Sequence, residues 1–188
     1  MDYLKSEQIT HVVDATHPFA VQMSKNAIAA CSMASIPLVA LTRPPWQKKE
    51  GDKWINVPNI EAAVQYLNQP KKRVLLAIGR QNLSLFHAQP HHNYILRLVD
   101  PPEEPLKFPN HSIILSKGPF TVKNDLALFK EHKIELVLAK NSGGDGAFSK
   151  IEVARILGLP VIMVDRPKIP SRKEIFHADS ALSWINQI

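Results

Sequence analysis

The chain of 188 residues contains 45% hydrophobic and 21% charged residues, a composition typical of folded globular proteins and not of disordered ones. Its formal net charge of +6 allows a polyanionic partner such as a nucleotide, a polycarboxylate or a nucleic acid, although a solvated basic surface is the simpler explanation. No apolar stretch reaches the roughly 20 residues of a membrane-spanning helix, and the lone Cys31 allows no internal disulfide, so the sequence predicts a cytoplasmic protein without a membrane partner.

Strands and helices alternate through the N-terminal part of the chain. Residues 9–15 form a β-branched run that predicts a strand, and an alanine-rich stripe over residues 20–34 predicts a helix that packs closely on a sheet. Strands are also predicted over residues 37–43 and 53–57, and a short helix follows. Three strands are too few for an independent sheet. Either this part pairs with the rest of the chain, or a segment upstream is missing.

A polar, proline-containing break over residues 68–73 separates this part from a second strand–helix series. The second series has five apolar strands, centred near residues 75, 96, 114, 137 and 163. Strands that are apolar on both faces and separated by helices predict an α/β fold with parallel sheets covered on both sides. We therefore expect two domains, an incomplete one over residues 1–70 and a complete one over residues 71–188.

Polar, glycine-rich or proline-rich stretches follow most of the predicted strands. In open parallel sheets, ligands bind beyond the carboxyl ends of the strands, so these stretches predict a binding site. Polar turns between strands and helices are common in any such fold, which is the alternative explanation. The stretches are residues 14–20, 42–46, 79–83, 116–120, 140–146 and 165–167.

The stretch KNSGGDG, residues 140–146, holds three of the seven glycines in the chain. Glycines between a strand and a helix permit positive φ angles and close backbone approach, and the start of a helix offers unpaired N–H groups. A phosphate or a carboxylate fits such a turn, but the order matches neither a P-loop nor GxGxxG, and a plain tight turn is the alternative. Gly79 and Arg80 end another strand, where the guanidinium is suited to a phosphate.

The histidines are less informative. His17 precedes a predicted helix and is either a hydrogen-bonded structural residue or a ligand-binding or acid–base group. His87, His91 and His92 lack carboxylate or cysteine partners at metal-ligand spacing, so the sequence predicts no metal site.

Together, five motifs resemble the precorrin-6A reductase family of cobalamin biosynthesis, in the family's order and over nearly the whole chain. They are VVDATHPFA, LTRPPW, IGRQNL, SKGPF and AKNSGGDGAFSKIEVARILGLPVIMVDRP. The resemblance implies two Rossmann-like domains and NADPH-dependent reduction of a ring double bond of precorrin-6A, or of cobalt-precorrin-6A, to the 6B product. It also implies a carboxylate-rich tetrapyrrole as the partner, and no nucleic acid.

The resemblance assigns roles to residues in these motifs. NADPH is expected to bind at Gly79, Arg80, Lys140, Ser142, Gly143 and Gly144, and the tetrapyrrole at His17, Arg43 and Trp46. The candidate proton donors are His17, Asp145 and solvent.

The chain departs from the family at its start, because it opens just before the family's third strand. We expect roughly fifty to sixty family residues to be absent, on the size of one βαβ unit and its extension. The alternative is therefore a truncated, non-catalytic nucleotide- or tetrapyrrole-binding module. Another nucleotide-dependent oxidoreductase, or a nucleic-acid binder supported by charge alone, also remains open.

Overall fold

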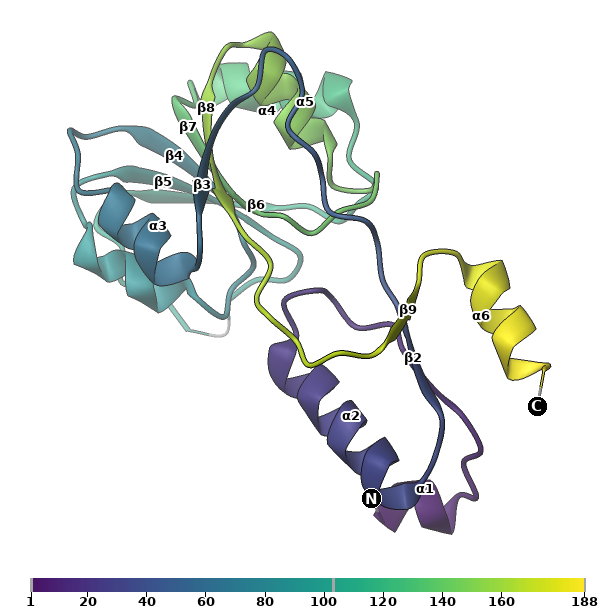
Figure 1. Ribbon diagram of the computed structural model, residues 1–188. Helices are drawn as coiled ribbons and strands as arrows, with labels where there is room; N and C mark the ends of the chain where they lie inside the picture. The colour runs from purple at the N-terminus through teal and green to yellow at the C-terminus, as the bar shows by residue number, and fades with distance from the viewer. Residues whose placement is uncertain (1, 103, 188) are drawn as a thin grey trace. The chain divides into compact units, whose positions relative to one another are not determined.

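The computed structural model describes residues 2–102 and 104–187 (Figure 1). Its helices are α1 (Asp2–Ser6), α2 (Val21–Ala34), α3 (Ile60–Tyr66), the 3-10 helix η1 (Leu83–Ala88), α4 (Val122–Glu131), α5 (Ser149–Ile156) and α6 (Ala178–Ile185). Its strands are β1 (Val12–Asp14), β2 (Leu38–Leu41), β3 (Lys53–Val57), β4 (Arg73–Ala77), β5 (Asn93–Leu98), β6 (His111–Leu115), β7 (Leu136–Lys140), β8 (Pro160–Val164) and β9 (Lys173–Ile175). All the strand pairs are parallel, so the predicted α/β class is confirmed. None of the helices in the described residues has the length and apolar character needed to cross a bilayer.

The chain forms two compact units. The first contains the residues up to Pro44 together with those from Pro167 onward, and the second is Pro45–Arg166. This division differs from the expected boundary at residue 70. The reason is that β3 pairs with β8, with Trp54 opposite Val161, which places β3 and the following α3 in the second unit.

The first unit has a three-stranded sheet in the order β1-β2-β9. Its outer strand β9 comes from the C-terminal part of the chain and pairs with β2 through Ala40 and Glu174. α2 packs on β1 and β2, and its alanine-rich stripe buries Cys31 as a small core residue. The helix ends at Ser35, whose left-handed conformation returns its N–H to the Cys31 carbonyl.

The second unit has a six-stranded sheet in the order β3-β8-β7-β4-β5-β6. Starting from β4, the chain adds β5 and β6 on one side of β4 and then adds β7 and β8 on the other side, as in the Rossmann fold. The five strands predicted for the second domain are all present, and β3 supplies the sixth position. α4 and α5 lie on one face of the sheet, and α3 and η1 lie on the other (Figure 1).

Each sheet therefore contains a strand from the other end of the sequence. β3, from the N-terminal part, belongs to the second sheet, and β9, from the C-terminal part, belongs to the first. The exchange suits the residues of β3, because Trp54 and Val57 are only 8% and 6% exposed in the second sheet. β9 is absent from the sequence prediction because its three residues, KEI, show no apolar run.

Candidate functional site

The second sheet reverses its strand order between β4 and β7, which pair directly, with Ala77 opposite Ala139. From β4 the chain continues to one side of the sheet, and from β7 it continues to the other. Such a reversal opens a crevice at the carboxyl edge, where ligands bind in α/β sheets. Gly79 and Arg80 follow β4, and Lys140 ends β7. The structure thus brings the two predicted cofactor loops to neighbouring strand ends.

The loop after β4 is open and turns sharply. Gly79 has a φ of +75°, which an L-residue rarely adopts, and a Cβ at this position would meet nothing within 4 Å. The glycine is therefore required by the backbone conformation and not by lack of space. Gly79 and Arg80 are exposed and border a hollow of about 270 Å³.

The turn after β7 presents a row of backbone amides. Gly143 and Gly144 both have positive φ angles, +68° and +71°. The carbonyl of Ser142 accepts a hydrogen bond from Arg166, and the carbonyl of Gly144 accepts one from the Trp46 indole. Within the described residues, the N–H groups of Gly143, Gly144 and Asp145 donate to nothing. Backbone amides in such turns can bind an anion, which stays a prediction for this turn. Gly143 is buried, Gly144 is half-buried and Asp145 is exposed.

The remaining predicted residues of this turn differ in exposure. Asp145 is exposed, whereas Ser142 is only 8% exposed, so its contribution is chiefly its backbone. Lys140 is half-buried, and burial lowers the pKa of its amine.

Trp46 belongs to the second unit, whereas the other predicted substrate residues, His17 and Arg43, belong to the first. It is 8% exposed and forms part of the apolar core beside α5. Its indole N–H already donates to the Gly144 carbonyl at 2.7 Å. The structure therefore places Trp46 on the core side of the turn formed by residues 142–145, which we call the amide turn.

A second hollow, of about 540 Å³, lies in the first unit at the carboxyl ends of its strands. It brings together the predicted residues His17 and Arg43, which follow β1 and β2 and are both exposed. Phe176, which follows β9 and is 48% exposed, gives this hollow an aromatic wall. Positive and imidazole groups beside an exposed ring suit an anionic ligand with a flat apolar face.

The ring of His17 has a defined orientation. Its Nδ1 accepts a hydrogen bond from the Phe19 N–H at 3.2 Å, so the neutral ring carries its proton on Nε2. In this tautomer the hydrogen-bond donor of the ring is its Nε2–H.

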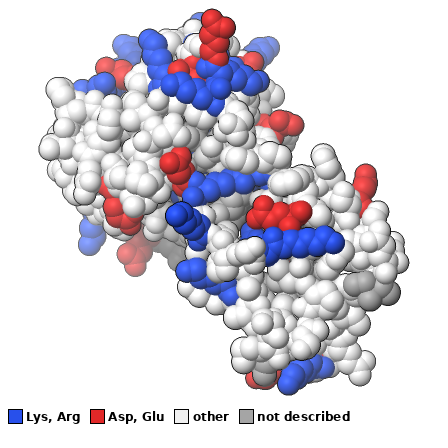
Figure 2. Space-filling model, viewed as in Figure 1, with Lys and Arg blue, Asp and Glu red and all other residues white. Residues whose placement is uncertain are grey.

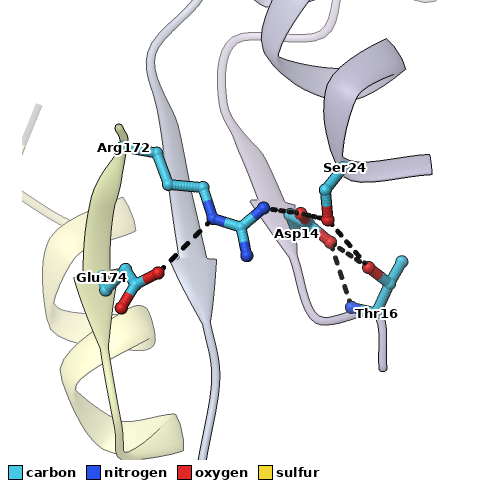
Figure 3. A network of polar contacts seen from close by, with 5 residues as sticks. All are labelled: Asp14, Thr16, Ser24, Arg172 and Glu174. Carbon is cyan, nitrogen blue, oxygen red and sulfur yellow. Dashed lines mark hydrogen bonds and ion pairs between the residues drawn. The ribbon is translucent and has the colours of Figure 1, made fainter. Parts of the chain in front are cut away.

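The turn that carries His17 is fixed by Asp14, at the end of β1 (Figure 3). Its carboxylate accepts hydrogen bonds from the Thr16 N–H and hydroxyl and from the Ser24 hydroxyl, and Arg172 donates to it at 2.8 Å. Burial alone would raise the pKa of Asp14, but these hydrogen bonds and the Arg172 charge outweigh burial and lower it. The network joins β1, α2 and the segment before β9.

Sequence reasoning placed Asp14 and Arg166 in strand-end stretches of the predicted site but gave neither residue a role, and it missed Phe176. Asp14 carries a local signal, because an aspartate two residues before a threonine at a strand end is typical of an Asx turn. Phe176 carries none, since its position depends on the pairing of β9 with the distant β2.

The charges on the surface are mixed. Figure 2 shows Lys and Arg side chains interspersed with Asp and Glu over the visible face, and they form no single long basic tract there.

The chain as a whole is similar to known proteins of one family. The model of the precorrin-6x reductase CbiJ/CobK family matches residues 1–186. A precorrin-6A reductase of Rhodobacter capsulatus is 49% identical over 98% of this chain and 74% of the relative. A cobalt-precorrin-6A reductase of Priestia megaterium is 34% identical over 89% of this chain and 69% of the relative.

A solved structure agrees with these matches. A CobK precorrin-6A reductase superposes with a TM-score of 0.96 at 49% identity, covering 98% of this chain and 76% of that one. The resemblance seen in the motifs is confirmed, and the chain belongs to the precorrin-6x reductase CbiJ/CobK family, a family of oxidoreductases.

Proposed function

We propose that this protein catalyses the NADPH-dependent reduction of a ring double bond of precorrin-6A, or of cobalt-precorrin-6A, to the 6B product. Family membership supports the reaction class. One observation carries the cofactor assignment: two loops follow the neighbouring strands β4 and β7 at the strand reversal. The loop after β7 contains the unbonded amides of residues 143–145, and the loop after β4 contains Arg80.

The second unit would bind the cofactor. A dinucleotide needs anion recognition for its phosphates, and the amides of Gly143 and Gly144 supply it without side chains. Arg80 would bind a phosphate oxygen with its guanidinium, Gly79 lets the backbone turn there, and the half-buried Lys140 adds positive charge beside Ser142. When bound, NADPH supplies the hydride, and the protein supplies orientation and charge placement.

The first unit would bind the tetrapyrrole. Arg43 and the Nε2–H of His17 would bind acetate or propionate groups of the macrocycle, and Phe176 would pack on its apolar face. His17 is also the proton donor that we favour, because its Nε2 bears a proton in the neutral ring and it borders the hollow. Asp145 belongs to the phosphate-binding turn instead.

The test has two steps on the purified chain. We expect NADPH titration to change the cofactor fluorescence saturably, and we expect added precorrin-6A to be converted to a product two mass units heavier as NADPH is consumed. Saturable binding without conversion would instead identify a non-catalytic binding module. Absence of binding, with wild-type folding verified by circular dichroism, would contradict the cofactor assignment.

A further inference from the structure

Trp46 is bound to the amide turn by both its backbone and its side chain. Its backbone N–H donates to the Asn141 Oδ1 at 2.7 Å, and its carbonyl accepts from the Asn141 Nδ2 at 3.0 Å. Its indole Nε1–H donates to the Gly144 carbonyl at 2.7 Å. Three hydrogen bonds therefore join the segment that enters the second unit to the segment that follows β7.

The Trp46 ring is also held from its surroundings. The Phe148 ring lies 5.6 Å from it, centre to centre, and the ammonium nitrogen of Lys150 lies 4.8 Å from its centre. Lys150 is 3% exposed, and its Nζ donates to the Ala147 carbonyl. Two buried side chains therefore hold the turn from its core side. Trp46 binds the carbonyl of Gly144, and Lys150 binds the carbonyl of Ala147.

Fixing a carbonyl also fixes the amide of the next residue. In a trans peptide the C=O and the following N–H point in opposite directions within one plane. With the Gly144 carbonyl directed to the Trp46 indole, the Asp145 N–H is directed away from the core. The Ser142 carbonyl is held by Arg166 at 3.0 Å, so the N–H of the buried Gly143 points away from Arg166.

We propose that Trp46 is a positioning residue for the dinucleotide: its indole holds the Gly144 carbonyl inward and thereby directs the turn's amides toward the phosphates, and Lys150 secures the same turn at Ala147. This inference rests on the proposed function for the identity of the ligand. It replaces the role of substrate contact that the sequence suggested, because a ring that is 8% exposed, with its N–H already bonded, has little surface to offer a macrocycle.

The second unit contains a matched control. Trp54 is also 8% exposed and lies in the same apolar core, yet its buried indole nitrogen has no hydrogen-bond partner. Trp46→Phe and Trp54→Phe therefore remove similar ring volume from one core, and only the first removes a hydrogen bond to the turn.

We expect Trp46→Phe to weaken NADPH binding on the order of three- to tenfold, the range of one lost hydrogen bond, with KM for NADPH raised and kcat at saturation retained. We also expect faster amide hydrogen exchange over residues 143–147 in the ligand-free variant. Trp54→Phe should leave both quantities at the wild-type value, although its melting temperature falls similarly. Equal NADPH affinity and equal exchange in the two variants would overturn the inference.

Lys150→Met gives an independent test. The variant keeps a long apolar side chain and removes a buried amine, so we expect its melting temperature to be retained or raised while NADPH binding weakens and exchange at Ala147 and Phe148 accelerates. A stable variant with wild-type binding and exchange would contradict the role of Lys150. If wild-type protein binds no NADPH, the proposed function fails, and the exchange rates still decide separately whether Trp46 fixes the turn.

Discussion

In the proposed function, the two carboxyl edges recognise ligands by different means. In the second unit, recognition comes from backbone amides whose direction is set by buried side chains, Trp46 and Lys150 among them. In the first unit it comes from exposed side chains, those of Arg43 after β2 and of His17 on the turn that Asp14 holds. The comparison teaches that substitution of an exposed residue should act directly on one ligand, whereas substitution of a buried one should act through the loop that it holds.

The largest effect is expected from Asp14→Ala. Asp14 and Arg172 form an ion pair with side chains that are 2% and 8% exposed, so removing the carboxylate leaves the buried guanidinium with only the longer ion pair to Glu174, at 3.8 Å. We expect a loss of about 3–5 kcal/mol in the stability of the first unit, measured by denaturant unfolding and by hydrogen exchange in β2.

Asp179→Ala is the matched control, because Asp179 is an exposed aspartate of the same unit. It should change stability by less than about 0.5 kcal/mol. Similar stabilities for the two variants would show that the network in Figure 3 does not hold the first unit together.

The next largest effects are expected on ligand binding, and they should differ between NADPH and the tetrapyrrole. Arg80→Ala should weaken NADPH binding roughly ten- to hundredfold, the range of a charge-assisted hydrogen bond, and leave the KM for the tetrapyrrole unchanged. Arg43→Ala should do the reverse, as measured by NADPH titration and steady-state kinetics.

Lys71→Ala serves as the charge control for Arg80→Ala, because Lys71 precedes β4 and so lies toward the opposite edge of the same sheet. If Arg43→Ala weakened NADPH binding as much as Arg80→Ala does, the division of labour between the units would be wrong.

A smaller effect concerns pH and the amide turn. Burial and the neighbouring Arg97 charge, opposed by Asp125, lower the pKa of Lys150 to about 7. An unfolded lysine has a pKa of about 10.4, so between these values the unfolded state binds more protons. The free energy of unfolding of the second unit should therefore rise from about pH 7 to pH 10, by at most about 1.4 kcal/mol per pH unit.

Lys150→Met should flatten that rise. Lys140, whose pKa is also lowered by burial, remains in the variant, so the difference between the two proteins isolates Lys150. Equal slopes would indicate that Lys150 titrates as an ordinary lysine.

The smallest effect is expected at the loop after β4. Gly79→Ala forces an L-residue to a φ of +75°, which should cost about 1 kcal/mol although the added methyl group meets open space. Gly146→Ala adds a methyl group to equally open space without a positive φ, so thermal unfolding should show almost no change. Equal losses in the two variants would contradict the conformational explanation of Gly79.

The sequence predicted most elements because strands such as β4 and β7 are apolar on both faces, and it predicted that loops with glycines and cations would follow neighbouring strand ends, as they do at Gly79 and Lys140. It did not predict the exchange of β3 and β9, since strand partners depend on packing between distant segments. Trp46 shows the same limit: a tryptophan in a strand-end motif suggests a ligand contact, and only the bonds to Asn141 and Gly144 reveal that it supports the turn.

The most direct test of the account is amide NMR of the isotopically labelled chain during NADPH titration. We predict that the amide signals of Gly143, Gly144 and Asp145 shift saturably together with those of Gly79 and Arg80, because the phosphates bind at the reversal between β4 and β7. Saturable shifts confined to residues away from these two loops, with the 143–145 amides unmoved, would contradict it.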